Sequence, residues 1–439
     1  MMTDIKEKLE QIRKERHSRS KSRVVSETWN KIQKEEDLTT KEKLERLINL
    51  TREKSLEKSR TPAFEPLPRE PLQFFENGFS LDAHYGKIKI SSGLEIRGDI
   101  LSCLSQEAAF IDLDLSTALF IDLETTGLSG GAGVVPFNVG LGYYRDDKFY
   151  VAQFFLGELA EEERMIRELA QFFKDMDFQS VVTYNGKGFD IPLLETRFIL
   201  CRQPFVLSEL PHLDFLYAAR RLWSHKYESC RLYHLALELV QVDRSEDIPS
   251  AEIPWRYFQY LQTGNFELIE PILYHNKEDI LSLLGVVIIG AHIFSEDPEL
   301  CVGDGMDFYG AGKVMENVGD VERSVQFFQR ALGGNLSDEV TLEAKKRLSS
   351  HFKRNDEWEK AVPLWEEMTS SRVVTPAQLY SFRELAMYLE HRLKKYEEAK
   401  RMAEEGFVLS AGVSSYYERD FSYRLERLRR RIKQRKEKA

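Results

Sequence analysis

Residues 118–133 have the sequence ALFIDLETTGLSGGAG, which predicts a buried strand followed by a glycine-rich turn. Its first half is almost continuously apolar from Ala118 to Leu123, as a strand buried on both faces must be. Two acids, Asp122 and Glu124, occupy alternate positions and therefore point to one face of the sheet. The glycines that follow give a backbone that another molecule can approach closely.

The elements after this strand alternate between strands and helices. The apolar pattern predicts strands at 137–144, 149–156 and 180–184 and helices at 161–173 and 191–201, with mostly helical structure from 212 to 294. Strand, hairpin, helix, strand and helix is the order of a three-layer α/β domain. We therefore expect an α/β domain with a mixed sheet over residues 80–295.

Composition sets the outer limits of the interpretation. The chain has 439 residues, of which 42% are hydrophobic and 31% charged, so it is too apolar to be wholly disordered and long enough for two or three folded units. No apolar run approaches the roughly 18 residues of a membrane span, and the charged start has no secretory signal pattern. The four cysteines lie far apart in the sequence, without the close pairs of a zinc site, so we expect them to be buried thiols. We expect a cytoplasmic protein without a membrane partner.

Charge is distributed unevenly along the chain. Residues 1–60 hold 17 basic and 12 acidic residues, and residues 424–439 hold nine basic and two acidic ones, although the net charge is −10. The first segment reads as a helical or disordered extension that either holds a polyanion or only improves solubility. Four prolines between 62 and 71 predict a linker over 61–79. The last segment reads as a basic tail.

The region 303–423 has helical periodicity and a loose internal repeat. Small residues recur at Ser324, Ala361 and Ala399, with spacings of 37 and 38 residues, each after a short polar turn. This resembles tetratricopeptide-type helical hairpins, in which small residues let paired helices approach closely. An irregular helical bundle is the alternative. We expect these repeats to offer a surface to a protein partner.

The two acids of the central strand indicate a site. Burying Asp122 and Glu124 on a core strand is costly unless cations or hydrogen bonds compensate, and a metal site is the obvious compensation. A third acid, Asp190, follows Asn185–Gly186–Lys187 where the buried strand 180–184 ends, and α/β sheets bind ligands at that end. Alone, Asp190 could be a helix N-cap.

A fourth acid and a histidine lie at the start of the apolar helix 280–291. His275 and Asp279 are four residues apart and so share one helix face, whereas Tyr274 and Glu278 share a neighbouring face. Carboxylates from separate elements can hold two hard divalent cations that activate water and stabilise the leaving oxygen of a phosphodiester. A histidine beside them would position or deprotonate that water, so the sequence predicts phosphodiester hydrolysis.

The order Asp122/Glu124, Asp190, His275/Asp279 resembles the DEDD exonuclease superfamily with its ribonuclease-H-like fold. A closer resemblance, to the YprB-like ribonuclease-H-like domain family, covers about residues 80–295. It is carried by LFIDLETTGLSGGAG, VVTYNGKGFDIPLLETR, DIPSAEIP and HNKEDILSL. The resemblance implies an exonuclease with two Mg²⁺ or Mn²⁺ ions held by the ligands Asp122, Glu124, Asp190 and Asp279.

The same resemblance implies contacts with the terminal nucleotide of a nucleic acid. In the superfamily the Thr-Gly-Leu after the first acids makes them, which corresponds to Thr126, Gly127 and Leu128. We add Asn185 and Lys187 as candidate substrate contacts because they precede Asp190. The two branches of the superfamily place a His five residues, or a Tyr four residues, before the last Asp.

This chain exchanges those two residue types, with Tyr274 at the first place and His275 at the second. Four residues return a helix to the same face, whereas five rotate it about 140° away, so we assign water activation to His275 and keep Tyr274 as the alternative. The resulting prediction is a two-metal exonuclease on single-stranded DNA or RNA. The rival is a non-catalytic nucleic-acid-binding adaptor that scaffolds proteins through the helical repeats. A polymerase proofreading domain is excluded because no polymerase domain fits in the remaining chain.

One further cluster, around Trp223 and Lys226, combines aromatic and basic residues. It could hold a single strand by stacking and phosphate contact, or it could be one face of an amphipathic helix.

Overall fold

The computed structural model describes residues 69–127, 133–245, 247–295, 301 and 303–438. All of them belong to one compact unit, Leu67–Ala439. The predicted N-terminal extension, residues 1–60, lies outside the described residues. Within the described part of the chain, no helix is both long and apolar enough to cross a bilayer.

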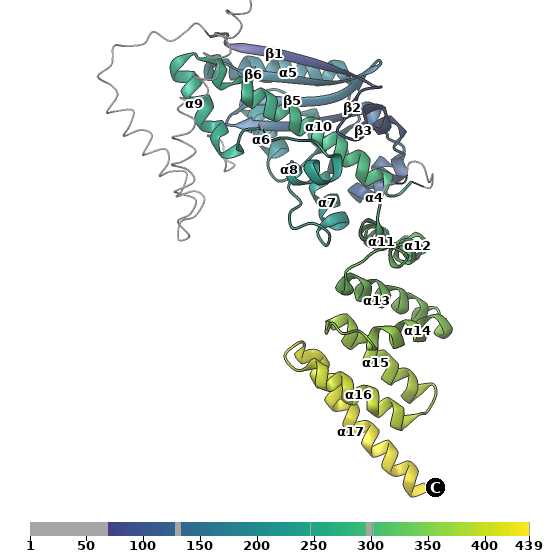
Figure 1. The fold of residues 1–439 in the computed structure, drawn as a ribbon. Coiled ribbons are helices and arrows are strands. Elements are labelled where there is room, and N and C mark those ends of the chain that lie inside the picture. Colours follow the sequence, from purple (N-terminus) through teal and green to yellow (C-terminus); the bar gives the residue numbers. More distant parts are fainter. Residues whose placement is uncertain (1–68, 128–132, 246, 296–300, 302, 439) are drawn as a thin grey trace, which may run out of the picture. The chain divides into compact units, whose positions relative to one another are not determined.

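A six-stranded mixed sheet forms the first part of the described chain (Figure 1). Its strands, in spatial order, are β1 (Leu72–Ser80), β6 (Lys148–Leu156), β5 (Pro136–Arg145), β4 (Ala118–Thr125), β7 (Ser180–Thr183) and β8 (His212–Asp214). The pairings from β1 to β4 are antiparallel, and β4–β7 and β7–β8 are parallel. The parallel pairings bring the carboxyl ends of β4, β7 and β8 to one edge. A small hairpin, β2 (His84–Tyr85) and β3 (Ile88–Lys89), stands apart from this sheet.

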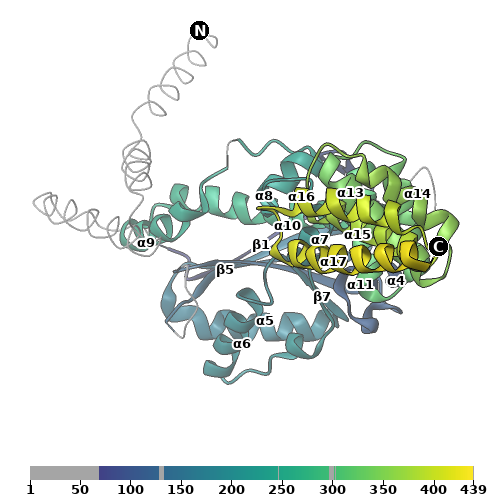
Figure 2. The same cartoon turned by 90° about the horizontal axis from the view of Figure 1, so that it is seen from below.

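Helices cover both faces of the sheet and make three layers, as the α/β pattern predicts. One face carries α5 (Glu162–Met176) and α6 (Asp190–Leu200). The other carries α4 (Gly98–Ser105), α7 (Phe215–Trp223), α8 (Leu232–Leu235) and α10 (Glu270–His292). Figure 2 shows α5 and α6 on the opposite side of the sheet from α10. The remaining helix of this part is α9 (Ile253–Thr263).

The alternation along β4 assigns its side chains to these two faces. Leu119, Ile121 and Leu123 pack into the core under α5 and α6. Phe120 packs into the core under α10 and α7, so Asp122 and Glu124 point to that second face. The pair of acids therefore sits on the side of the sheet that α10 covers.

Strand β1 differs from the predicted arrangement, in which residues 61–79 are a linker. Leu72–Ser80 pairs antiparallel with the full length of β6 and forms an edge of the sheet. The prolines do not prevent this, because Pro71 immediately precedes the strand and edge strands tolerate proline there. The linker interpretation can therefore apply only before residue 72.

The second part of the chain is all helical. Its helices are α11 (Gly305–Val318), α12 (Val321–Leu332), α13 (Asp338–Arg354), α14 (Trp358–Thr369), α15 (Pro376–His391), α16 (Tyr396–Ser410) and α17 (Ser415–Lys438). Each packs against the next (Figure 1). The repeated small residues Ser324, Ala361 and Ala399 lie on α12, α14 and α16 and are buried. The Ser324 hydroxyl donates to the carbonyl of Gly312 at 2.9 Å, which holds α12 close to α11.

Residues of α7 and the turn after it attach to α11. The fully buried Trp223 donates its indole N–H to Asp307 at 3.0 Å, and Lys226 pairs with the same carboxylate at 2.8 Å. Trp223 and Lys226 of the aromatic and basic cluster are thus occupied by contacts within the protein. They join the sheet domain to the first helix of the helical region.

Candidate active site

The two acids of β4 lie beside α10 because strand β5 has a glycine opposite Asp122. Asp122 is in register with Gly140, and Glu124 with Asn138. A Cβ at residue 140 would lie 2.1 Å from Oδ1 of Asn276, so only glycine lets this side chain of α10 reach the sheet. Glu124 is 8% exposed, and Asp122 is half-buried.

Asn276 fixes the first acid. Its Nδ2 donates to Oδ2 of Asp122 at 2.8 Å and to the Asp122 carbonyl at 3.1 Å. Its Oδ1 accepts from Nε2 of the buried Gln153 at 2.9 Å, and the same Gln153 nitrogen donates to the carbonyl of Leu273 at 2.9 Å. Because the glutamine can only donate here, the asparagine amide has one orientation, and it presents its N–H to the carboxylate.

Asp190 reaches the same site from the end of β7. It is the first residue of α6, is 8% exposed, and forms a hydrogen bond with the backbone of Leu123 in β4. The loop before it is held by Asp214, whose carboxylate accepts the backbone N–H groups of Asn185 at 2.7 Å and Lys187 at 3.1 Å. The helix N-cap is Phe189, so Asp190 does not cap α6.

Helix α10 contributes the remaining predicted residues. The helix begins at Glu270, so His275 and Asp279 both lie within it. Nε2 of His275 is 3.4 Å from Oδ2 of Asp279 and 4.0 Å from Oε1 of Glu124. The structure therefore brings Asp122, Glu124, Asp190, His275 and Asp279 together. Tyr274, on the adjacent face, is 40% exposed and lies under Nζ of Lys277.

Two residues that the sequence did not single out complete the charge cluster. Nδ1 of His275 is 2.8 Å from Oδ1 of Asp247. The guanidinium of Arg244, whose side chain is 1% exposed, pairs with Asp247 and also donates to Oδ1 of Asp279 at 2.5 Å. Arg244 thus bridges Asp247, which faces Nδ1 of His275, and Asp279, which faces Nε2.

Crowding of acids sets their protonation. Burial raises the pKa of Asp122 well above its usual value, and the charges of Asp279 and Asp190 raise it further. Burial and the charge of Asp122 do the same to the pKa of Glu124. Burial raises the pKa of Asp190 to about 7. Each of these carboxyls would be more stable beside an additional cation.

The contact between His275 and Asp247 shifts the pKa values of both residues. Burial disfavours protonated His275, but the hydrogen bond to Asp247 and the charge of Asp279 outweigh it and raise the pKa of His275. Burial alone would raise the pKa of Asp247, but the hydrogen bond with His275 lowers it below its usual value, and Arg244 assists. Asp247 is thus an ionised acceptor that holds the Nδ1 proton of His275.

The predicted substrate residues that the structure describes lie on the two segments that carry Glu124 and Asp190. Thr126 exchanges two 3.0 Å hydrogen bonds with Val135, which pins the end of β4 beside the start of β5. Gly127 is the last described residue before the gap, and Leu128 lies outside the described residues. Asn185 has a positive φ of 70° in the loop that Asp214 holds. Lys187 is partly exposed and pairs with Glu107 at 2.6 Å.

Divalent cations match the donor chemistry of this site, since hard cations prefer carboxylate oxygens. Beside Glu124, the buried amide of Asn138 has no hydrogen-bond partner in the described part of the chain, so it has capacity for a bound group. No group of three or more His, Cys, Asp or Glu side chains among the described residues is already arranged to hold an ion. Contacts within the site account for this, because Asn276 takes one oxygen of Asp122 and Arg244 one of Asp279.

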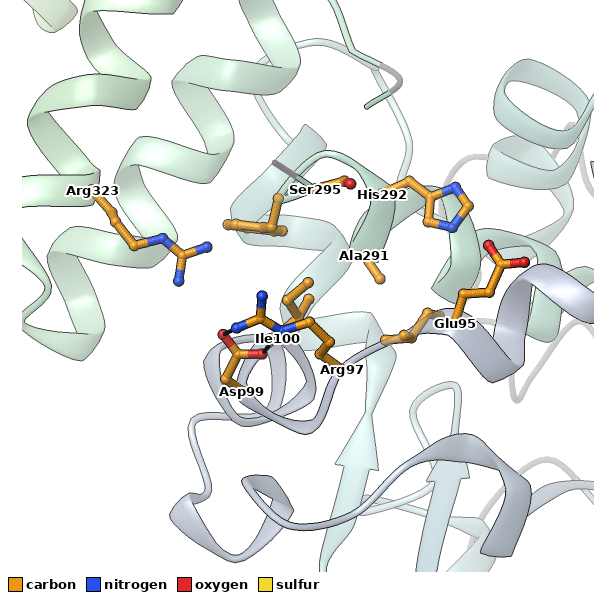
Figure 3. Close-up of a pocket in the computed structure, with 10 residues that line it drawn as sticks. Glu95, Arg97, Asp99, Ile100, Ala291, His292, Ser295 and Arg323 are labelled. Atoms are coloured by element: carbon orange, nitrogen blue, oxygen red, sulfur yellow. Dashed lines mark hydrogen bonds and ion pairs between the residues drawn. The ribbon is translucent and has the colours of Figure 1, made fainter. Parts of the chain in front are cut away.

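A cavity of about 220 Å³ lies elsewhere, between α4, α10 and α12 (Figure 3). Arg97 pairs with Asp99 at its wall, and His292 and Arg323 also line it. None of the predicted site residues that the structure describes lines this cavity. The carboxylate cluster on β4 is therefore the candidate active site.

Comparisons with known proteins agree with this fold. The RNase_H superfamily model matches residues 119–289, which places this domain in the ribonuclease H-like class. The chain is 32% identical over 314 residues to the Bacillus subtilis protein named "Uncharacterized protein YprB", covering 71% of this chain and 74% of that one. The protein belongs to the YprB family.

A solved structure also resembles the chain. The family B DNA polymerase from the archaeon Pyrobaculum calidifontis is 18% identical, with a TM-score of 0.32. The similarity covers 46% of this chain and 29% of the polymerase.

The residues that the sequence did not single out share one property, namely that they hold other parts of the site in place. They are Gln153, Asp214, Arg244, Asp247 and Asn276. Asn276 had a usable signal, because it stands between His275 and Asp279 at the start of a helix. Asp247 also had a signal, because it begins the DIPSAEIP motif that carries the resemblance, although no role was assigned to it. Arg244 had none, since the short charged stretch that contains it is typical of an ordinary loop.

Proposed function

We propose that the protein is a metal-dependent nuclease that removes nucleotides from single-stranded nucleic acid ends by a DEDD-type, two-metal mechanism. The observation that carries the proposal is the meeting of four acids from β4, α6 and α10, of which Glu124 and Asp279 face Nε2 of His275. A purely structural cluster would not concentrate carboxylates whose pKa values are raised by burial and by one another's charge. Membership of the ribonuclease H-like class supports nucleic acid as the substrate.

His275 acts on the attacking water in this proposal. Asp247 accepts a hydrogen bond from Nδ1–H of His275, so Nε2 is the nitrogen left to take a proton from water. That nitrogen points between Glu124 and Asp279, where a water bound near the acids would lie. Tyr274 is the weaker candidate because its ring is exposed on another face of α10.

Asp122, Glu124, Asp190 and Asp279 are the residues that would hold Mg²⁺ or Mn²⁺. When bound, two such ions lower the pKa of water and stabilise the leaving oxygen. The chain's own contribution is to fix the acids: Asn276 orients Asp122, and Arg244 holds Asp279 and Asp247. We assign substrate contacts to Thr126, Gly127 and Leu128, together with Asn185 and Lys187 from the loop before α6.

The test is cleavage of single-stranded DNA and RNA, labelled at either end, with Mg²⁺ or Mn²⁺. Wild type should shorten one end stepwise, which also establishes polarity and sugar preference. Asp122→Asn should lose at least about 10³-fold in rate while it still folds and binds. The exposed Asp112→Asn is the matched control and should cleave like wild type. Equal activity of Asp122→Asn and wild type would refute the assignment.

A second candidate function is a non-catalytic adaptor that binds nucleic acid. The observation favouring it is that Arg244 and Asn276 already occupy oxygens of Asp279 and Asp122. Metal titration with thermal melting separates the two. A cation-dependent rise in Tm that Asp122→Asn abolishes supports the nuclease, and no rise in either protein supports the adaptor.

The helical region has its own proposed role. We propose that residues 303–423 are tetratricopeptide-like hairpins that bind a protein partner, because small buried residues recur on α12, α14 and α16. Pull-down with residues of the paired helices substituted on the exposed side would test this. Loss of a partner only from those variants, with nuclease activity unchanged, is the expected result.

A further inference from the structure

Two groups among the basic residues of α17 face different surroundings. Arg424, Arg427 and Arg431 share one side of the helix, since spacings of three and four residues return to one face. All three contact Glu390 of α15, a carboxylate with no exposed surface. The distances from their guanidinium nitrogens to its oxygens are 3.4, 2.6 and 3.2 Å. These three arginines compensate the buried charge of Glu390.

A second group lies on the outer side of the same helix. Arg429, Lys433 and Lys436 follow at spacings of four and three residues, which puts successive Cβ atoms about 5–6 Å apart in one stripe. The side chains of Lys433 and Lys436 are 80% and 76% exposed. Lys433 forms a long ion pair with Glu437 at 3.9 Å, and Lys436 forms one with Glu397 at 3.7 Å. Such exposed pairs contribute little, so both ammonium groups can exchange their partner for another anion.

This stripe lines a groove of about 430 Å³ between α16 and α17. Lys400 of α16 lines the same groove and pairs with Glu404 at 3.3 Å, so four cations meet three acids there. Residues 424–439 hold nine basic and two acidic residues, and this excess of positive charge stands out in a chain whose net charge is −10. The groove therefore complements an extended anion.

We propose that the groove formed by Lys400, Arg429, Lys433 and Lys436 binds the phosphate backbone of a nucleic acid strand. The inference rests on the proposed function, which supplies nucleic acid as substrate. Lysine and arginine that neutralise phosphates release condensed counterions, and this contribution is independent of sequence. The site would retain a strand without reading its bases, in contrast to the acidic cluster, which acts on the scissile bond.

The experiment measures binding of a fluorescein-labelled single-stranded oligonucleotide by anisotropy, in EDTA, at several salt concentrations. The variant is the triple Arg429→Gln, Lys433→Gln, Lys436→Gln. Its affinity at about 0.1 M salt should fall at least tenfold. The slope of log K against log salt should become shallower by about 2, since single strands give about 0.7 per neutralised phosphate. The control is Lys148→Gln, Lys174→Gln, Arg372→Gln, three exposed positions with the same charge change.

The outcomes separate this inference from the proposed nuclease activity. Metal-dependent cleavage of a dinucleotide, too short to span the groove and the acids, should be unchanged in the triple variant. If the triple variant loses oligonucleotide binding while neither it nor wild type cleaves any substrate, the binding role of the groove is supported and the nuclease proposal fails. Equal affinity and slope in the triple variant and the control overturn the inference. So does a loss confined to anionic phospholipid vesicles.

Folding of the variant is checked by its Tm, which should match wild type because all three side chains are exposed. Should the triple variant melt early, the single Lys433→Glu replaces it. That charge reversal should weaken binding at least threefold, and unchanged binding would again overturn the inference.

Discussion

The protein buries two clusters of charge with opposite imbalance. In the helical region one carboxylate, Glu390, is surrounded by three arginines. On the sheet, five acids lie close together, and Arg244 and His275 are the cations that contact them in the described part of the chain. Their pKa shifts follow. Burial would raise the pKa of Glu390, but the arginines lower it, whereas the pKa values of Asp122 and Glu124 rise.

The difference separates a structural cluster from a functional one. A carboxylate with several cations needs nothing further, and removing it leaves buried positive charge. Acids that outnumber their cations are held at a cost, which a bound cation would relieve. Counting the opposite charges around buried acids therefore indicates which cluster is available for ligand binding.

The largest expected effect is on the structural cluster. Glu390→Ala should lower the free energy of unfolding by about 3–5 kcal/mol, because breaking a buried ion pair leaves uncompensated charge. Since the folded-state pKa of Glu390 is lowered, its contribution is complete above the unfolded-state value of about 4.3 and is lost as pH falls through the folded-state value. Urea unfolding at pH 7 measures it. Glu426→Ala, with an exposed side chain 3.6 Å from Arg430, is the control and should cost under about 1 kcal/mol.

The next effect concerns the residue that holds His275. Asp247→Asn should lower kcat about 10²-fold, equivalent to about 2.7 kcal/mol, with KM nearly unchanged, because the substitution removes the charge that orients the imidazole. Steady-state cleavage kinetics measure both constants. Asp243→Asn changes an exposed acid of the same segment and should behave as wild type. An equal loss in both variants would show that Asp247 has no special role.

A smaller expected effect tests how much the buried acids lower the stability of the metal-free protein. The pKa of Asp190 is about 7 in the fold and about 3.9 in the unfolded chain, so the native state binds more protons between these values. Stability of the metal-free protein should therefore fall as pH rises from about 4 to 7. Asp190→Asn removes this loss and should raise Tm in EDTA at pH 8, by about 2–4 °C for each kcal/mol regained, but not at pH 4. A pH-independent difference would contradict the reasoning.

The smallest effect is at the rim. Lys187→Gln breaks a partly exposed pair with Glu107, so stability should change by less than about 1 kcal/mol. If Lys187 contacts substrate, KM should nevertheless rise several-fold. A KM equal to that of wild type would remove Lys187 from the substrate-binding residues.

Most of the sheet domain follows from its apolar pattern. Strands β4, β5, β6 and β7 and helices α5 and α6 begin and end within three residues of the predicted limits. Their burial on both faces leaves a continuous signal along the sequence. Strand β1 was missed because its pairing with β6 joins residues more than 60 positions apart, and its own sequence lies next to prolines. Strand β8 has three residues, too few for a period to show.

The acids of the candidate site were predictable, and the side chains that hold them were not. Asp122 interrupts an apolar run, and such a break is visible locally. The bond from Asn276 to Asp122 joins residues 154 positions apart, and the pair between Arg244 and Asp279 spans 35. These contacts depend on how α10 crosses the sheet, which no local pattern encodes.

Helix α10 carries the residues of the site and the core on one continuous backbone. His275, Asn276 and Asp279 stand in its first half, and Ile280 to Ala291 are buried. A single inserted or deleted residue within it would turn everything beyond by about 100° and shift it by 1.5 Å. Length variation among relatives should therefore be confined to the loops, and this helix should change over evolutionary time by substitution alone.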